Sequence, residues 1–284
     1  MLYVLSTDAR VDPFSARQRV VVIGNANSAN EMAAQLVPVA QLPVYRSTRR
    51  VSVFPSLPDD RIEDVGPVLQ YSRSANGNLT VHLEDRTIDD VDYVLFGTGY
   101  YPEVSYLRVL DPTVATYSAS SSDRAPRSLV PLTDRRIQPI RVPLLYRHVL
   151  YAHNTSLGFI GALVSFIPFA MADLTSTWLA LVWSPCGIDI PPTTEERLVD
   201  EQARLETLHQ LRSKTDNPSD LVSFHFLGGY ELPYAQEVRA EILQAAPGLG
   251  GILAPWDDEQ DTRRFAMYAA KLGSLYALAG KKKE

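Results

Sequence analysis

Cysteine is almost absent from the sequence, which contains Cys186 alone. A single thiol excludes an internal disulfide framework and a zinc site built from cysteines. The sequence has no G-x-x-x-x-G-K-[ST] segment, which excludes a standard P-loop, and no G-x-S-x-G nucleophile elbow of a serine hydrolase. No carboxylate-rich cluster accompanies the five histidines, so we expect no metal site.

An excess of basic charge is also missing. The 27 basic and 33 acidic side chains give a net charge of -6, so we expect no nucleic-acid partner. The first residues lack the basic start of a secretory signal, and Pro168 and Asp173 interrupt the most apolar stretch, residues 157–183. These features favour a cytoplasmic protein. The alternative is association with the endoplasmic reticulum membrane, because the tail Lys281-Lys282-Lys283 resembles a dilysine retrieval signal.

What the sequence does contain is the pattern of an α/β protein. Residues 19–23 form a β-branched run typical of a strand buried on both faces of a parallel sheet. A helix-favouring segment follows at 28–36, and a second strand is expected at 44–47. Further strands are expected at 51–54, 68–71, 79–83 and 91–96, a loop at 115–128, and helices beyond residue 192, with Thr194 or Asp261 as caps.

The turn after the first strand is a variant of the G-x-G-x-x-G/A phosphate-binding loop. A glycine permits the tight turn, small residues let the backbone approach a pyrophosphate, and the following helix N-terminus offers free N–H groups. An ordinary strand-to-helix turn is the alternative interpretation. The predicted cofactor-binding residues of this turn are Gly24, Asn25, Ala26, Asn27, Ser28 and Ala29.

The end of the second strand favours NADP(H) over NAD(H). A domain that binds NAD(H) has an acidic residue about 20 positions after the loop, and this residue hydrogen-bonds the ribose 2′-OH. None occurs between Met32 and Pro58, and the basic segment 45–50 stands there instead. We predict that Arg46, Ser47 and Arg49 bind a 2′-phosphate through charge-assisted hydrogen bonds, the alternative being a solvated basic turn.

Three stretches in order resemble the flavin-containing monooxygenases, the class B flavoprotein monooxygenases. They are residues 19–50, the segment 92–100 (D-Y-V-L-F-G-T-G-Y), and residues 145–178 with L-Y-R, L-G-F-I-G and a tryptophan-containing helix. The resemblance implies an NADPH-binding Rossmann-like domain inserted into a split FAD-binding domain. It places Thr98 and Gly99 near both cofactors and implies FAD- and NADPH-dependent transfer of oxygen from O2 to a small-molecule substrate with a soft nitrogen or sulfur nucleophile.

The sequence departs from this family in one respect. The family's first G-x-G-x-x-G, the FAD fingerprint, is absent, and we expect a domain-sized missing piece before Gly24. We expect a residual segment at 1–16, the NADP-binding Rossmann-like domain at 17–98, the returning part of the FAD-binding domain at 99–190 and a helical C-terminal region at 191–284. Uncovered sheet edges would then favour self-association.

Three hypotheses follow for the activity. The first is a flavin-containing monooxygenase-like oxidoreductase, whose catalytic residues the sequence does not identify. The second is a truncated, non-catalytic remnant that binds NADP(H). The third, ranked last because no Ser-Tyr-Lys or histidine proton relay is recognisable, is a flavin-free NADP-dependent dehydrogenase.

Overall fold

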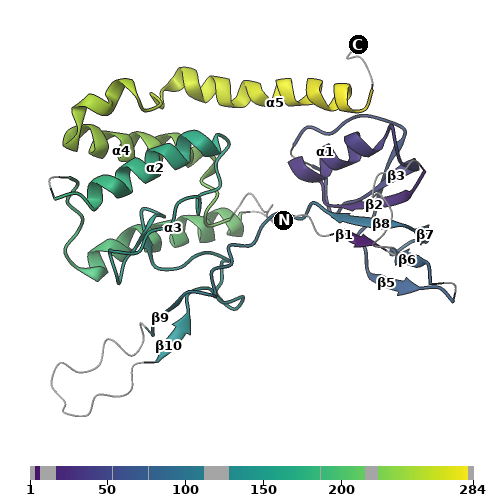
Figure 1. Cartoon of the computed structure of the whole chain (residues 1–284), viewed down its shortest axis with the longest axis horizontal. Helices are drawn as coiled ribbons and strands as arrows, with labels where there is room; N and C mark the ends of the chain where they lie inside the picture. Colours follow the sequence, from purple (N-terminus) through teal and green to yellow (C-terminus); the bar gives the residue numbers. More distant parts are fainter. Residues whose placement is uncertain are drawn as a thin grey trace. The chain divides into compact units, whose positions relative to one another are not determined.

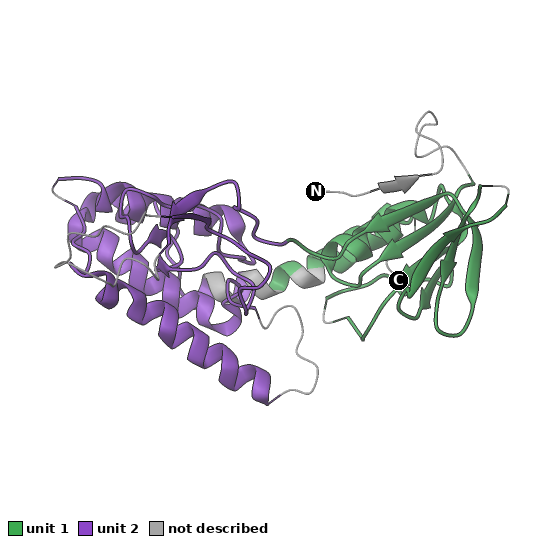
Figure 2. Cartoon of the chain, turned by 90° about the horizontal axis from the view of Figure 1, so that it is seen from below, with its two compact units in different colours: residues 1–100, 265–284 green, residues 101–264 purple. Residues whose placement is uncertain are grey.

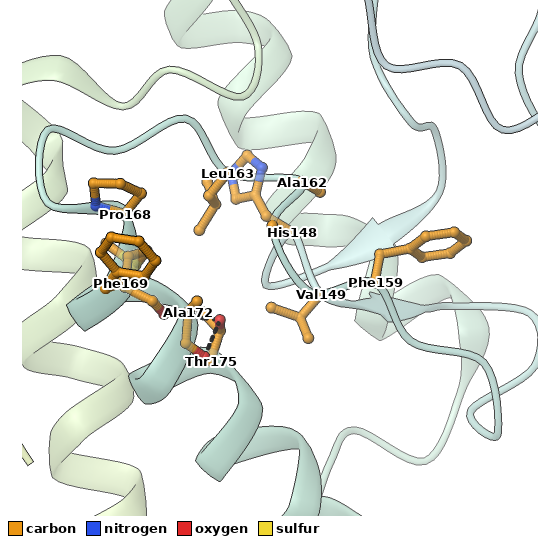
Figure 3. Close-up of a pocket in the computed structure, with 11 residues that line it drawn as sticks. His148, Val149, Phe159, Ala162, Leu163, Pro168, Phe169, Ala172 and Thr175 are labelled. Carbon is orange, nitrogen blue, oxygen red and sulfur yellow. Dashed lines mark hydrogen bonds between the residues drawn. The ribbon is translucent and has the colours of Figure 1, made fainter. Parts of the chain in front are cut away.

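The computed structural model describes residues 4–6, 17–52, 54–75, 77–111, 128–185, 187–214 and 223–280. The chain forms two compact units (Figure 2). Residues 1–100 and 265–284 make the first unit, and residues 101–264 make the second. The domain ranges expected from the sequence stay predictions.

A five-stranded sheet is the centre of the first unit, in the order β1-β8-β2-β3-β4 (Figure 1). Strands β8, β2, β3 and β4 are parallel, and β1 pairs with β8 in the antiparallel sense. Helix α1 (Asn27–Leu36) connects β2 to β3 and gives the expected strand–helix–strand unit. The strands are β1 (Val4–Ser6), β2 (Arg19–Ile23), β3 (Gln41–Ser47), β4 (Ile62–Val65) and β8 (Tyr93–Phe96).

A smaller antiparallel sheet lies between β4 and β8 in the sequence. It consists of β5 (Gln70–Arg73), β6 (Leu79–His82) and β7 (Thr87–Val91). Strand β2 packs on two hydrophobic clusters: Val20 and Val22 face the cluster that contains α1, and Val21 faces the cluster of the smaller sheet. This burial on both faces explains the continuous β-branched run.

The end of the long helix α5 (Asp258–Leu278) completes the first unit. Leu275 and Ala279 are buried in the same cluster as α1, the Arg61 guanidinium donates to the Ala279 carbonyl at 3.1 Å, and Lys271 bonds Glu31 at 2.6 Å. A segment more than 200 residues away in sequence therefore covers the α1 side of the sheet.

Helices dominate the second unit. Helix α2 packs against α4, and Trp178, Leu174, Val238 and Ile242 are central to their shared cluster. The helices are α2 (Pro168–Val182), α3 (Thr194–Ser213) and α4 (Glu231–Ala245), with the 3-10 turns η1 (Gly228–Tyr230) and η2 (Pro247–Gly251). The strand pairs are β9 (Arg108–Leu110) with β10 (Leu129–Pro131), and β11 (Leu145–Tyr146) with β12 (Leu150–Tyr151).

The α/β fold class is confirmed, but several element boundaries differ from the sequence predictions. Residues 51, 52 and 54 are not in a strand, and the expected strand at 68–71 runs over 70–73. The expected strand at 91–96 is divided at Asp92, because β7 of the smaller sheet ends at Val91 and β8 of the five-stranded sheet begins at Tyr93. Thr193, not Thr194, caps α3 in a capping box with Glu196. The loop expected at 115–128 lies, except for residue 128, outside the described residues.

In the described part of the chain, no helix has the length and apolar character that crossing a membrane requires.

Candidate functional site

The turn between β2 and α1 requires glycine at two positions. Gly24 adopts a φ of +117°, and a Cβ on it would lie 2.5 Å from the Gly97 carbonyl oxygen. A Cβ on Gly97 would lie 2.7 Å from the Ala29 Cβ and 2.8 Å from the Ala29 backbone nitrogen. The ends of β2 and β8 and the first turn of α1 therefore pack at backbone contact distance, as a phosphate-binding turn needs.

Helix α1 begins without a side-chain cap. Ala26 is the extended N-cap residue, the first turn contains no acidic residue, and the first intrahelical bond runs from the Asn30 N–H to the Ala26 carbonyl at 3.0 Å. The N–H groups of the first turn thus have no partner within the helix. The free N–H groups and the absence of acidic residues in this turn fit a bound pyrophosphate.

Side-chain bonds tie the segment after β3 to this turn. The Asn25 side-chain amide donates to the Arg50 carbonyl, and the Ser52 hydroxyl donates to the Asn25 carbonyl. Gly24 N–H also donates to the Ser47 carbonyl at 2.9 Å. The basic segment and the glycine turn are therefore adjacent.

Arg46 is buried within the first unit. Its guanidinium bonds both Asp64 carboxylate oxygens, from Nε at 2.6 Å and Nη2 at 2.8 Å, and Nη1 donates to Asn30 Oδ1 at 2.9 Å. The Asn30 amide in turn donates to the Pro55 carbonyl at 2.9 Å. A phosphate contact by Arg46 would have to break these bonds, and its role as a phosphate ligand stays a prediction.

The other predicted residues differ in exposure. Ser47 is buried, and its hydroxyl donates to the Gly66 carbonyl at 2.9 Å, whereas the Arg49 side chain is exposed. Thr98 and Gly99 are exposed and follow β8, at the same carboxyl edge of the parallel strands as the turn. The structure brings the turn, Arg49 and Thr98-Gly99 to one edge and turns the side chains of Arg46 and Ser47 inward.

Sequence reasoning missed three residues that shape this edge: Asn30, Ser52 and Asp64. Asn30 is fully buried and lies one turn into α1, and Ser52 lies in a segment that the sequence predicts as a strand. Asp64 lies on β4, a strand that the sequence did not predict, opposite Arg46 in the parallel register. Only that register reveals the partner of Arg46.

Comparison with known proteins supports the family resemblance. No family model matches the chain. It is similar to the thiol-specific monooxygenase of Saccharomyces cerevisiae, with 24% identity over 269 residues, 94% of this chain and 53% of that protein. The resemblance to flavin-containing monooxygenases is confirmed. The chain spans about half the length of this curated relative.

The fold has a counterpart among solved structures. The crystal structure of Tmm from a Pelagibacter species matches with a TM-score of 0.50 and 18% identity, over 79% of this chain and 42% of Tmm. At this identity the match supports the α/β fold and nothing finer.

Proposed function

We propose that the chain is part of a flavin-containing monooxygenase-like oxidoreductase whose first unit binds NADPH. The similarity to a monooxygenase over 94% of the chain carries the proposal, and the geometry of the Gly24 turn supports it. In the proposed reaction NADPH, a proton, O2 and a substrate with a soft nitrogen or sulfur nucleophile give NADP+, water and the oxygenated substrate.

The residues of the first unit have distinct roles in this proposal. The backbone from Gly24 to Ala29 holds the pyrophosphate, because the free N–H groups and the dipole of α1 favour negative charge there. Arg49, which is exposed in the segment that follows β3, contacts the 2′-phosphate. Arg46 positions that strand through Asp64 and Asn30. NADPH supplies the hydride, and these residues orient it.

FAD is proposed from the resemblance alone. Among the described residues, the Gly24 turn is the one place where a parallel strand leads directly into a helix start, and NADPH takes it in this proposal. We therefore assign no side chain to FAD. An NADP(H)-binding chain without oxygenase activity is the second candidate, and the single turn of this kind favours it.

Nucleotide titration tests the proposal. Nicotinamide fluorescence should show saturable binding of NADPH that is about tenfold or more tighter than binding of NADH, since a charge-assisted contact contributes about 1.5–3 kcal/mol. R49A should remove this preference. R46A should instead lower the free energy of unfolding by about 2 kcal/mol, because buried Asn30 loses its donor.

The outcomes separate the candidates. Equal affinity for both nucleotides, or an R49A variant that binds like the wild type, would contradict the 2′-phosphate assignment. Tight NADPH binding with no NADPH oxidation after FAD is added would favour the second candidate. NADPH oxidation that needs FAD and O2 would support the first.

A further inference from the structure

A carboxylate occupies the guanidinium of Arg46 in the way that a phosphate would. Asp64 Oδ1 accepts from Arg46 Nε at 2.6 Å, and Asp64 Oδ2 accepts from Arg46 Nη2 at 2.8 Å. Arginine offers the same two parallel N–H groups to two oxygens of a phosphate. The parallel register of β3 and β4 places the two residues opposite each other. Asp64 therefore holds the place that an anionic ligand would take on Arg46.

The carboxylate is the accessible member of this ion pair. The Asp64 side chain is 55% exposed, whereas the Arg46 side chain is 7% exposed. The guanidinium also donates from Nη1 to Asn30 Oδ1 at 2.9 Å, and Asn30 is fully buried. A ligand that approaches from solvent therefore meets Asp64 before it meets the guanidinium.

The ion pair lies beside the proposed nucleotide site. In β3 the next residue is Ser47, whose carbonyl accepts from Gly24 N–H at 2.9 Å. One residue further, the Thr48 N–H donates to the Val65 carbonyl of β4, also at 2.9 Å. Both strands of the pair therefore run directly into the edge that contains the glycine turn. The negative charge of Asp64 opposes a phosphate at this edge.

We propose that Asp64 is a specificity-determining residue that limits how strongly the first unit selects the 2′-phosphate of NADPH. This inference rests on the proposed function. With Asp64 in place, the guanidinium of Arg46 is withheld from the phosphate. Without the carboxylate, a buried guanidinium loses its anion, and the 2′-phosphate becomes the group that compensates it.

Two adenosine nucleotides that differ by the 2′-phosphate alone test this role: adenosine 2′,5′-bisphosphate and adenosine 5′-monophosphate. Calorimetric titration of the full chain should show D64N binding the bisphosphate about tenfold or more tightly than the wild type does, because asparagine keeps the shape of the side chain and removes its charge. Affinity for the monophosphate should change by less than about twofold.

The neighbouring residue in β4 supplies a matched control. Glu63 lies opposite Tyr45 in the register and forms its ion pair with Arg86. E63Q removes the same charge from the same strand and leaves the Arg46 pair intact. It should bind both nucleotides like the wild type. An equal gain in E63Q and D64N would reduce the effect to overall charge and overturn the proposal.

A double substitution shows whether Asp64 acts through Arg46. Asp64→Asn introduced into an R46M chain should change the affinity for the bisphosphate by less than about twofold, because the guanidinium that the carboxylate withholds is absent. A tenfold gain in that background would contradict the proposed competition.

A measurement on the wild type covers the case in which D64N does not fold. The ¹⁵N-edited NMR signal of the Arg46 Nε–H should keep its position while adenosine 2′,5′-bisphosphate saturates the chain, since Asp64 retains the guanidinium. Transfer of this N–H from Asp64 to the phosphate would overturn the proposal.

The outcomes separate this inference from the proposed function. A wild type that prefers the bisphosphate, with a D64N variant that gains nothing, would retain the proposed function and overturn the role of Asp64. A wild type without the preference, with a D64N variant that acquires it, would support the role of Asp64 and contradict NADPH selection by the natural chain. If neither protein binds the bisphosphate more tightly than the monophosphate, both proposals fail.

Discussion

Gly97 lies where the end of β8 meets the first turn of α1, and this contact has no space for a methyl group. A Cβ there would meet the backbone of Ala29, which cannot rotate away. We expect G97A to move α1 and to lower the free energy of unfolding by about 1–3 kcal/mol, measured by urea denaturation. G66A is the matched control, because a Cβ on Gly66 would meet nothing within 4 Å. Equal effects of the two substitutions would show that the described contact is not tight.

His148 and His225, whose Nδ1 atoms lie 3.4 Å apart, make the second unit sensitive to acid. Both pKa values are lowered in the folded state, that of His225 to about 4, so the unfolded chain takes up protons first as the pH falls below 6.5. The two neutral histidines therefore make their full contribution to the free energy of unfolding above pH 6.5. The contribution of His225 is lost as the pH falls from 6.5 to 4. Each histidine loses at most about 1.4 kcal/mol per pH unit. Burial also lowers the pKa of His153, so protonation of this residue destabilises the folded state at low pH as well.

Tryptophan fluorescence can follow this loss, because Trp178, Trp183 and Trp256 all belong to the second unit. Urea unfolding at pH 7.5 and pH 5 should give a clear decrease for the wild type. H148F removes one of the titrating groups and should show a smaller decrease between the same two pH values. An unchanged pH dependence in H148F would mean that His148 is not buried as a neutral ring.

At the scale of elements, the end of α5 is a structural part of the first unit. Leu275 is fully buried against α1, whereas Leu278 on the same helix is 41% exposed. We expect L275A to cost about 2–5 kcal/mol and L278A to change stability by less than about 0.5 kcal/mol. Amide hydrogen exchange of β2 should accelerate in L275A alone. Similar exchange in both variants would contradict the packing of α5 on this sheet.

Elements whose signal is local could be predicted from the sequence, and those that depend on pairing could not. The run at 19–23 predicted β2 because burial on both faces requires continuous apolar side chains. Strand β4 contains Glu63 and Asp64 and has no such run, so its place beside β3 depends on the sheet register. The burial of Arg46 could not be predicted from the sequence for the same reason. In the sequence it is one of three arginines in a basic segment, and its burial depends on the ion pair with Asp64 on β4.

At the scale of the whole molecule, bound NADPH should stabilise one unit and leave the other unchanged. NADPH at 100 times its dissociation constant adds about 2.7 kcal/mol to the part of the chain that binds it. Hydrogen exchange should then slow in β2, α1, β3 and the end of α5, which share one unit, and stay unchanged in α2 and α4. If NADPH slows exchange throughout the chain, the two units unfold as one cooperative body, and a stability change in any variant described above would no longer report on one unit alone.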